Sequence, residues 1–196
     1  MERYFYHGME PYYGCFGYSI GIMINILRNE GIRTRNNVMN HYNTKFEHVC
    51  LYKKNEEYDY IEEKAMLKSA RNGWIDGCFV FIISPDILAK KVKQSSTTGF
   101  DENNNPTTDL VDEWRSIGPI PNTKIEGIAL PFVAINEYLN SKDNDEEILE
   151  DKKQLIELLP KLKSLAESMG IFIVDSGEKN FTDKLDEQLN YKKKRK

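Results

Sequence analysis

Apolar and polar residues follow two different spacings along the chain. Several short segments alternate between apolar and polar residues or are continuously apolar, and Gly, Pro or Asn bounds them, which is typical of β-strands. We predict six strands, at residues 3–7, 48–53, 78–84, 113–117, 124–130 and 171–174. The segment at 78–84, CFVFIIS, is apolar along almost its whole length and stops at Pro85, which predicts a central strand buried on both faces.

Other segments repeat apolar residues every three to four positions, as an amphipathic helix does. The first predicted helix covers residues 19–28, with Ser19 as its N-cap and Gly31 as the signal that ends it. The second follows the acidic run at 143–147, which suits a helix N-terminus, and is interrupted or kinked near Pro160. Its apolar stripe consists of Ile148, Leu149, Leu155, Ile156, Leu159 and Leu162.

The remaining stretches are polar. Residues 54–72 are charged and fit either a loop or a short helix. Residues 94–105 are rich in Ser, Thr, Asn and Gly, which predicts an exposed, mobile loop. Together these elements predict an α+β fold with a mixed or antiparallel split sheet, on which the helix at 19–28 packs with other flanking helices.

Length and composition favour one domain in a reducing compartment. The chain has 196 residues, of which 40% are hydrophobic, so we expect a single domain over 1–196. We expect residues 141–190 to form a helical C-terminal extension packed on it, and 191–196 to form a basic tail. The three cysteines include no C-x-x-C pair, no apolar run is long enough to span a membrane, and no secretion signal opens the chain. We therefore expect a cytoplasmic protein with no membrane partner.

A few residues carry chemistry of their own. His7 followed by Gly8, at the predicted end of the first strand, would let a ligand approach the backbone beside a hydrogen-bonding ring. Glu113 lies where a polar loop enters a strand, a common place for an oriented carboxylate. Glu126 lies inside an apolar strand, and we expect it to point outward.

Metal and thiol chemistry have weaker support in the sequence. Cys15 could pair with His41 or His48 as a nucleophile and its base, although its surroundings match no specific cysteine-hydrolase signature. The three histidines include no H-x-x-x-H pair, and the acidic residues at 101–105 lack the spacing of a calcium loop, so we expect no metal. The net charge of −4 does not indicate a surface built as a whole for a polyanion.

The order of several short motifs resembles one family. YHG at 6–8, ILRNEGI at 26–32 and HVCL at 48–51 are followed by DEWRSIGPIP at 112–121 and KIEGI at 124–128. This order is similar to that of the ADP-ribosyltransferase-like fold, over about residues 3–133. The resemblance implies an enzyme that uses NAD as co-substrate, breaks the bond between nicotinamide and ribose, and transfers ADP-ribose to a macromolecular acceptor, as bacterial toxins and effectors do.

The same resemblance implies roles for individual residues. His7 would bind the adenosine ribose of NAD, and the backbone of Gly8 would hold the nicotinamide amide. Glu113 would bind the 2′-hydroxyl of the nicotinamide ribose and stabilise the positive charge that develops on that sugar. Tyr52 and Tyr58 would stack on the nicotinamide ring.

Some features leave the function open. Val49-Cys50-Leu51 occupies the strand where many family members carry Ser or Thr, and Val111 stands where a Glu or Gln associated with arginine or asparagine acceptors would be. The acceptor can therefore be a protein, a nucleic acid or a small molecule. The alternatives are a binding module for NAD or ADP-ribose, or for another protein, that has lost turnover, and a cysteine hydrolase that uses Cys15.

Overall fold

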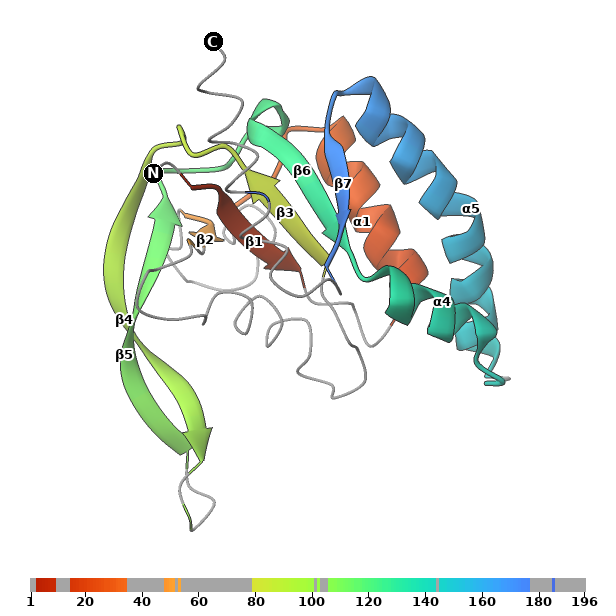
Figure 1. Ribbon diagram of the computed structural model, residues 1–196, viewed down its shortest axis with the longest axis horizontal. Helices are drawn as coiled ribbons and strands as arrows, with labels where there is room; N and C mark the ends of the chain where they lie inside the picture. Colours follow the sequence, from red (N-terminus) through yellow and green to blue (C-terminus); the bar gives the residue numbers. More distant parts are fainter. Residues whose placement is uncertain are drawn as a thin grey trace.

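Two β-sheets lie side by side in the computed structural model, and helices cover one face of the larger sheet (Figure 1). The structure describes residues 3–9, 15–34, 48–51, 53, 79–100, 102, 106–143, 145–176 and 185, and only the backbone of 94–100 and 106–113. The larger sheet has the order β1-β3-β6-β7, with β1 at Phe5–Met9, β3 at Phe79–Ile83, β6 at Ile125–Leu130 and β7 at Phe172–Asp175. The smaller sheet has the order β2-β5-β4, with β2 at Cys50–Leu51, β4 at Ala89–Phe100 and β5 at Pro106–Ser116.

Strand directions confirm the α+β class with mixed and antiparallel sheets. In the larger sheet β1 and β6 run antiparallel to β3, while β7 runs parallel to β6. All pairings in the smaller sheet are antiparallel. Each of the six predicted strands overlaps an observed one, although β1 continues to Met9, so that His7 and Gly8 lie inside the strand rather than at its end.

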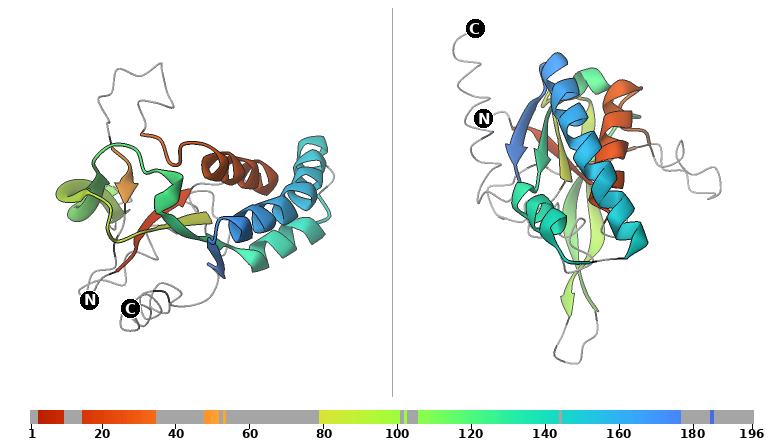
Figure 2. Two further views of the ribbon diagram at one scale, coloured as in Figure 1. Left: turned by 90° about the horizontal axis from the view of Figure 1, so that it is seen from above. Right: turned by 90° about the vertical axis from the view of Figure 1, so that its right-hand side faces the viewer.

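The core forms on both faces of β3, as the apolar run predicts. Every residue of this strand is fully buried. One face packs against the helices α1 (Phe16–Arg28) and α5 (Glu146–Ser168), which lie on the same side of the sheet (Figure 2). The opposite face carries a smaller cluster that includes Tyr4, Tyr6, Val80, Ile82, Ala129 and Leu185.

A bulge in β6 keeps its apolar residues on the helix-covered face. The pairing with β3 skips Glu126, because Ile82 lies opposite Gly127 and the next residue, Ile83, lies opposite Ile125. An extra residue of this kind shifts the alternation of side chains by one. Ile125 and Ile128 therefore both join the core under the helices, and Glu126, at the bulge, is half-buried.

Helix α1 begins earlier than the sequence predicts. It starts at Phe16 with Cys15 as the N-cap residue, and the Ser19 hydroxyl donates to the Cys15 carbonyl at 2.8 Å from inside the first turn. The prediction of Ser19 as the N-cap was wrong, because the first amides of the helix, those of Gly17 and Tyr18, donate to the carboxylate of Asp151 in α5. Its last residue is Arg28, and Gly31 follows at φ +92°, in the left-handed region that glycine adopts without strain.

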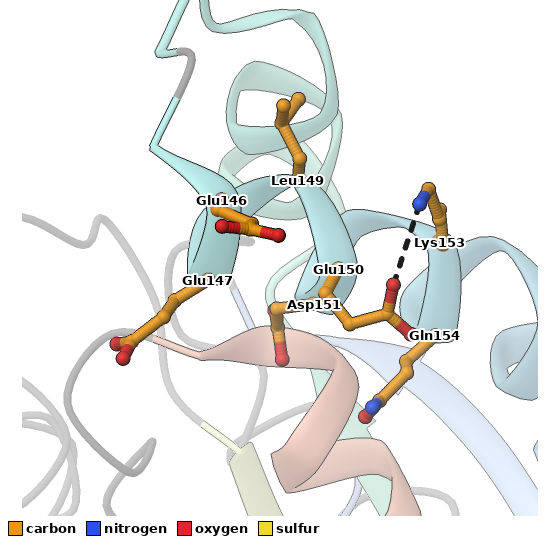
Figure 3. Close-up of a pocket in the computed structure, with 7 residues that line it drawn as sticks. All are labelled: Glu146, Glu147, Leu149, Glu150, Asp151, Lys153 and Gln154. Atoms are coloured by element: carbon orange, nitrogen blue, oxygen red, sulfur yellow. Dashed lines mark hydrogen bonds and ion pairs between the residues drawn. The ribbon is translucent and has the colours of Figure 1, made fainter.

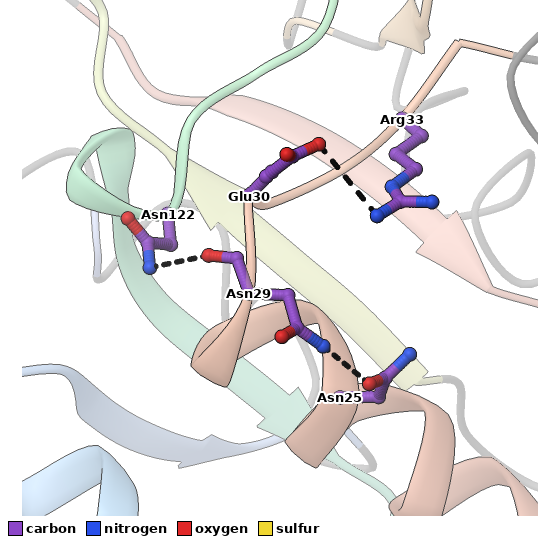
Figure 4. Close-up of polar contacts among 5 residues, drawn as sticks. All are labelled: Asn25, Asn29, Glu30, Arg33 and Asn122. Carbon is purple, nitrogen blue, oxygen red and sulfur yellow. Dashed lines mark hydrogen bonds and ion pairs between the residues drawn. The ribbon is translucent and has the colours of Figure 1, made fainter.

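The C-terminal end of α1 is fastened to the connection between β5 and β6. The side-chain amide of Asn122, in the short 3-10 helix η1 (Asn122–Lys124), donates to the carbonyl of Leu27 at 3.0 Å and to that of Asn29 at 2.8 Å. Figure 4 shows the second of these bonds. Ile32 and Ile120 exchange two backbone hydrogen bonds, at 2.8 and 2.9 Å. The two bonds of Asn122 satisfy carbonyls that the helix end leaves open.

The expectation of a mobile loop at 94–105 was wrong for most of its length. Residues up to Phe100 belong to β4, and β5 begins at Pro106, so the two strands form a long hairpin that projects from the body (Figure 1). The segment contains Thr97 and Thr98, and Thr107 and Thr108 follow on the partner strand. Such β-branched residues favour strands, and the antiparallel ladder satisfies their backbone groups although the segment is polar.

The C-terminal half contains two helices, of which only the second was predicted from the sequence. Helix α4 (Phe132–Asn140) follows Pro131 directly and was not predicted. Helix α5 begins after Asp145, whose carboxylate accepts from the Glu147 amide at 2.9 Å, as the acidic run predicts, and it continues through Pro160 without interruption. Its buried face contains Asp151, Lys152, Leu155, Leu162 and Ala166, whereas Leu149 and Ile156 of the expected stripe are exposed.

Candidate functional site

The two sheets meet where β1 lies beside β2. The ring Nδ1 of His7 lies 2.9 Å from the carbonyl oxygen of Cys50. A carbonyl only accepts hydrogen bonds, so this contact places a proton on Nδ1. His7 is half-buried and Gly8 is buried, opposite Phe81 and Val80 of β3. The predicted ligand-binding pair therefore lies on the strand that joins the sheets.

An aromatic corner supports this junction. The rings of Phe5 in β1 and Trp114 in β5 pack edge to face, with centroids 5.4 Å apart. The Lys53 ammonium lies 4.7 Å from the centre of the Phe5 ring and 5.4 Å from that of Trp114, within the range of a cation–π interaction. Leu51 pairs with Trp114 across β2 and β5. The contact between the Phe5 and Trp114 rings therefore holds β5 against β1, and each ring is partly covered by the other strand.

Glu113 lies in β5 immediately before Trp114. Its backbone pairs with Val92 of β4, and its side chain is among those that the structure leaves undescribed. The fold thus brings the strand of Glu113 to the corner where β1 carries His7, with β2 between the two strands. Tyr52 and Tyr58, the predicted stacking residues, lie outside the described residues.

Ser116 connects β2 to the end of β5, a role that could not be predicted from the sequence. Its hydroxyl accepts from the Val49 amide at 2.8 Å and donates to the Gly118 carbonyl at 2.6 Å. Val49 and Ser116 also share a backbone hydrogen bond at 3.1 Å. The short β2 is therefore anchored to the end of β5, which holds the Cys50 carbonyl in place for His7. A buried Ser at a strand end, four residues before Ile120, gave no signal in the sequence that set it apart from other serines.

Cys15 lies in surroundings that suppress thiol chemistry. Burial raises the pKa of this thiol, and the negative charges of Asp151 and Glu147 raise it further. Because the thiolate is the reactive form, these surroundings disfavour the cysteine-hydrolase alternative. His41, one of the two proposed bases, lies outside the described residues, and His48 forms an isolated bridge with Gly118.

A buried carboxylate at the start of α1 is the strongest polar feature that the sequence analysis missed. Asp151 accepts from the backbone amides of Gly17 and Tyr18, each at 2.9 Å, and from the Tyr138 hydroxyl at 2.9 Å. Burial, followed by the hydrogen bond and the charge of Asp151, raises the pKa of Tyr138. Asp151 precedes Leu155 by four residues and so shares its helix face, which is the signal that could have located it.

The first turns of α5 form a shallow acidic hollow around this carboxylate. Figure 3 shows Glu146, Glu147 and Glu150 at its rim and Asp151 pointing towards α1. Glu150 pairs with Lys153 at 3.3 Å. The carboxylate of Asp151 already accepts from three donors, and Glu146 and Glu147 lie in the first turn of α5, where negative charge stabilises a helix N-terminus.

No protein-family model matches the chain, and neither the curated proteins nor the solved structures include a significant match. No group of three or more His, Cys, Asp or Glu side chains within the described ranges could hold a metal ion. Among the helices that the structure describes, none is long and apolar enough to cross a membrane.

Proposed function

We propose that the protein is an NAD-dependent ADP-ribosyltransferase with an ADP-ribosyltransferase-like fold. The observation that carries the proposal is the contact between His7 of β1 and the Cys50 carbonyl of β2, because it brings together the edge strands of the sheets β1-β3-β6-β7 and β2-β5-β4. Strand β2 pairs with β5, the strand that contains Glu113. This proximity of the strands with His7, Gly8 and Glu113 supports the proposal.

The proposed binding step uses the geometry of β1. The hydrogen bond from Nδ1 to the Cys50 carbonyl fixes the orientation of the His7 ring, and an imidazole in a fixed orientation suits a ribose hydroxyl as its partner. Gly8 has no side chain, so a carboxamide can approach its backbone closely. Both features suit the adenosine ribose and the nicotinamide amide of NAD.

The proposed chemical step depends on one carboxylate. Breaking the bond between nicotinamide and ribose leaves the electron pair with nicotinamide, which departs neutral, while positive charge develops on the ribose. A fixed carboxylate at Glu113 stabilises that charge as it forms, and the leaving group needs no general acid. The acceptor, a protein or a nucleic acid, then bonds to the ribose carbon and loses its proton.

Glu113→Gln is the variant that tests this mechanism. It keeps the shape and hydrogen-bonding capacity of the side chain but removes its charge, so we expect kcat to fall by about two to three orders of magnitude with little change in the Kd for NAD. Etheno-NAD turnover reports kcat, and calorimetry reports Kd. Glu126→Gln, at the bulge in β6, is the matched control and should retain activity.

Other outcomes would lead to different conclusions. Activity lost in Glu126→Gln and kept in Glu113→Gln would identify the wrong carboxylate. NAD binding without turnover in the wild-type protein would favour the inactive binding module, for which the absence of a Ser or Thr at Val49-Cys50-Leu51 is the supporting observation. Mass spectrometry of cell extract incubated with the protein and labelled NAD would identify the acceptor.

A further inference from the structure

The short strand β2 has one side towards β5 and the other towards β1. The Ser116 amide donates to the Val49 carbonyl at 3.1 Å, so Val49, immediately before β2, directs its backbone groups towards β5. Successive residues of an extended chain direct their carbonyls to opposite sides. The carbonyl of Cys50 therefore faces away from β5, and Nδ1 of His7 donates to it at 2.9 Å. The position of β2 on β5 thus determines where this acceptor lies.

The side chain of Ser116 takes the place of one backbone bond between these segments. In a regular antiparallel ladder, a hydrogen-bonded pair of residues exchanges two backbone bonds. Here the Val49 amide donates at 2.8 Å to the Ser116 hydroxyl, and the same hydroxyl donates at 2.6 Å to the Gly118 carbonyl. Ser116 is buried, so loss of the hydroxyl would leave the Val49 amide without this acceptor where water reaches poorly.

The rest of the pairing between β2 and β5 is short. Among the described residues, it covers only Cys50 and Leu51 of β2. Short strand pairs are marginally stable without further support. The two bonds of the Ser116 hydroxyl, which start at the residue next to Cys50, therefore supply a large part of what holds the Cys50 carbonyl in its place.

We propose that Ser116 is a positioning residue for His7. By holding β2 on β5, it sets the orientation and the tautomer of the His7 ring, and thereby the affinity for NAD. The part that concerns NAD rests on the proposed function, in which His7 binds the adenosine ribose. Ser116 acts through β2 and not on the reacting atoms, so its loss should weaken binding of NAD and leave the chemical step almost unchanged.

Nuclear magnetic resonance of the imidazole nitrogens tests the positioning without any ligand. At alkaline pH, where imidazole is neutral, we expect Nδ1 of His7 to keep its proton in the wild-type protein, because the Cys50 carbonyl accepts from it. In Ser116→Ala the population with the proton on Nε2 should rise at least about threefold, as expected when a hydrogen bond of ordinary strength is weakened. The signals are assigned by their absence in His7→Asn.

Steady-state kinetics and calorimetry test the consequence for NAD. In Ser116→Ala we expect KM and Kd for NAD to rise about tenfold while kcat stays within about twofold, because the weakened interaction is common to bound substrate and transition state. Ser116→Thr keeps the hydroxyl and suits a strand, so it should restore both the Kd and the tautomer. Ser84→Ala removes another buried serine hydroxyl, at the end of β3, and as the matched control it should change neither.

Circular dichroism confirms that each variant folds. If alanine at this position prevents folding, Ser116→Cys takes its place in every measurement, because a thiol of similar size is a weak donor and a weak acceptor. The tautomer and the KM for NAD should then shift in the same direction as expected for alanine.

Several results would overturn the proposal. The same His7 tautomer in Ser116→Ala as in the wild type would show that β2 is held without the hydroxyl, and an equal change in Ser84→Ala would show a general loss of stability. A changed tautomer with an unchanged Kd would overturn the link to NAD. A wild-type protein that binds no NAD, but whose His7 tautomer depends on Ser116, would overturn the proposed function and support the positioning role.

Discussion

Asp151 connects three helices through one carboxylate. It belongs to α5, caps the amides at the start of α1 and accepts from Tyr138 of α4. Only 6% of the residue is exposed, so each of these donors would lose its partner in a place that water reaches poorly. The carboxylate therefore determines where the first turn of α1 lies relative to α5.

Asp151→Asn should lower the free energy of unfolding by about 1–3 kcal/mol, because an amide has a single acceptor oxygen for three donors and no charge for the helix N-terminus. Urea denaturation measures the change. Glu150→Gln, one residue earlier and exposed, is the matched control, and its loss should stay within about 0.5 kcal/mol because its ion pair with Lys153 is at the surface. Equal losses in the two variants would contradict the role given to Asp151.

Cys15 should be an unreactive thiol at neutral pH. Its raised pKa keeps the sulfur protonated at a pH where an ordinary thiol is partly ionised. In a Cys50→Ser/Cys78→Ser background, we expect iodoacetamide to alkylate Cys15 more slowly than glutathione at pH 8, with the rate increasing only at higher pH. If Cys15 were alkylated faster than glutathione, the result would support the cysteine-hydrolase alternative.

At the scale of elements, the contact between α1 and α5 depends on one glycine. A Cβ placed at Gly17 would lie 2.4 Å from the Asp151 carbonyl oxygen and 2.8 Å from the Leu155 nitrogen. Both atoms belong to the backbone of α5, so relief requires the helices to move apart. A Cβ at Gly21, one turn later in α1, would lie 3.5 Å from the Leu158 side chain, which is an ordinary contact.

Gly17→Ala and Gly21→Ala should therefore have opposite effects on stability. Alanine in a helix interior is favoured over glycine by about 1 kcal/mol, so Gly21→Ala should raise the thermal midpoint. Gly17→Ala should lower the free energy of unfolding by about 1–3 kcal/mol, because the clash with α5 outweighs that gain. Differential scanning calorimetry of the two variants measures both changes in stability. Stabilisation by both substitutions would show that α5 does not approach α1 this closely.

At the scale of the whole molecule, the two sheets share one core. Val49, just before β2, and Leu51 of β2 pack in the same cluster as Phe5 and Phe81 of the larger sheet, and Trp114 packs against it. A shared core of this kind favours cooperative unfolding of both sheets. The junction that carries His7 is then as stable as the rest of the domain.

Unfolding followed at Trp114 should coincide with unfolding followed over the whole backbone. In a Trp74→Phe variant Trp114 is the single tryptophan, and its fluorescence reports the contact with Phe5. We expect the fluorescence and far-UV circular dichroism transitions in urea to have the same midpoint. An earlier fluorescence transition would mean that the smaller sheet detaches before the larger one unfolds.

Much of the fold could be predicted because its signals are local. The run at Phe79–Ile83 is apolar without interruption, and only a strand covered on both faces buries such a run, as β3 is. The spacing from Ile20 to Leu27 likewise determined the buried face of α1. The acidic run before α5 marked its start, since a carboxylate satisfies amides at a helix N-terminus.

What only the tertiary structure decided depends on contacts between residues far apart in the chain. The start of α1 follows from Asp151, over 130 residues away, and the hairpin at β4 and β5 follows from cross-strand pairing that polar composition conceals. The contact of His7 with the Cys50 carbonyl also required the docking of two sheets. A pattern along the sequence records which residues each element must bury, but hydrogen bonds between elements depend on how the buried faces meet, and only packing determines that.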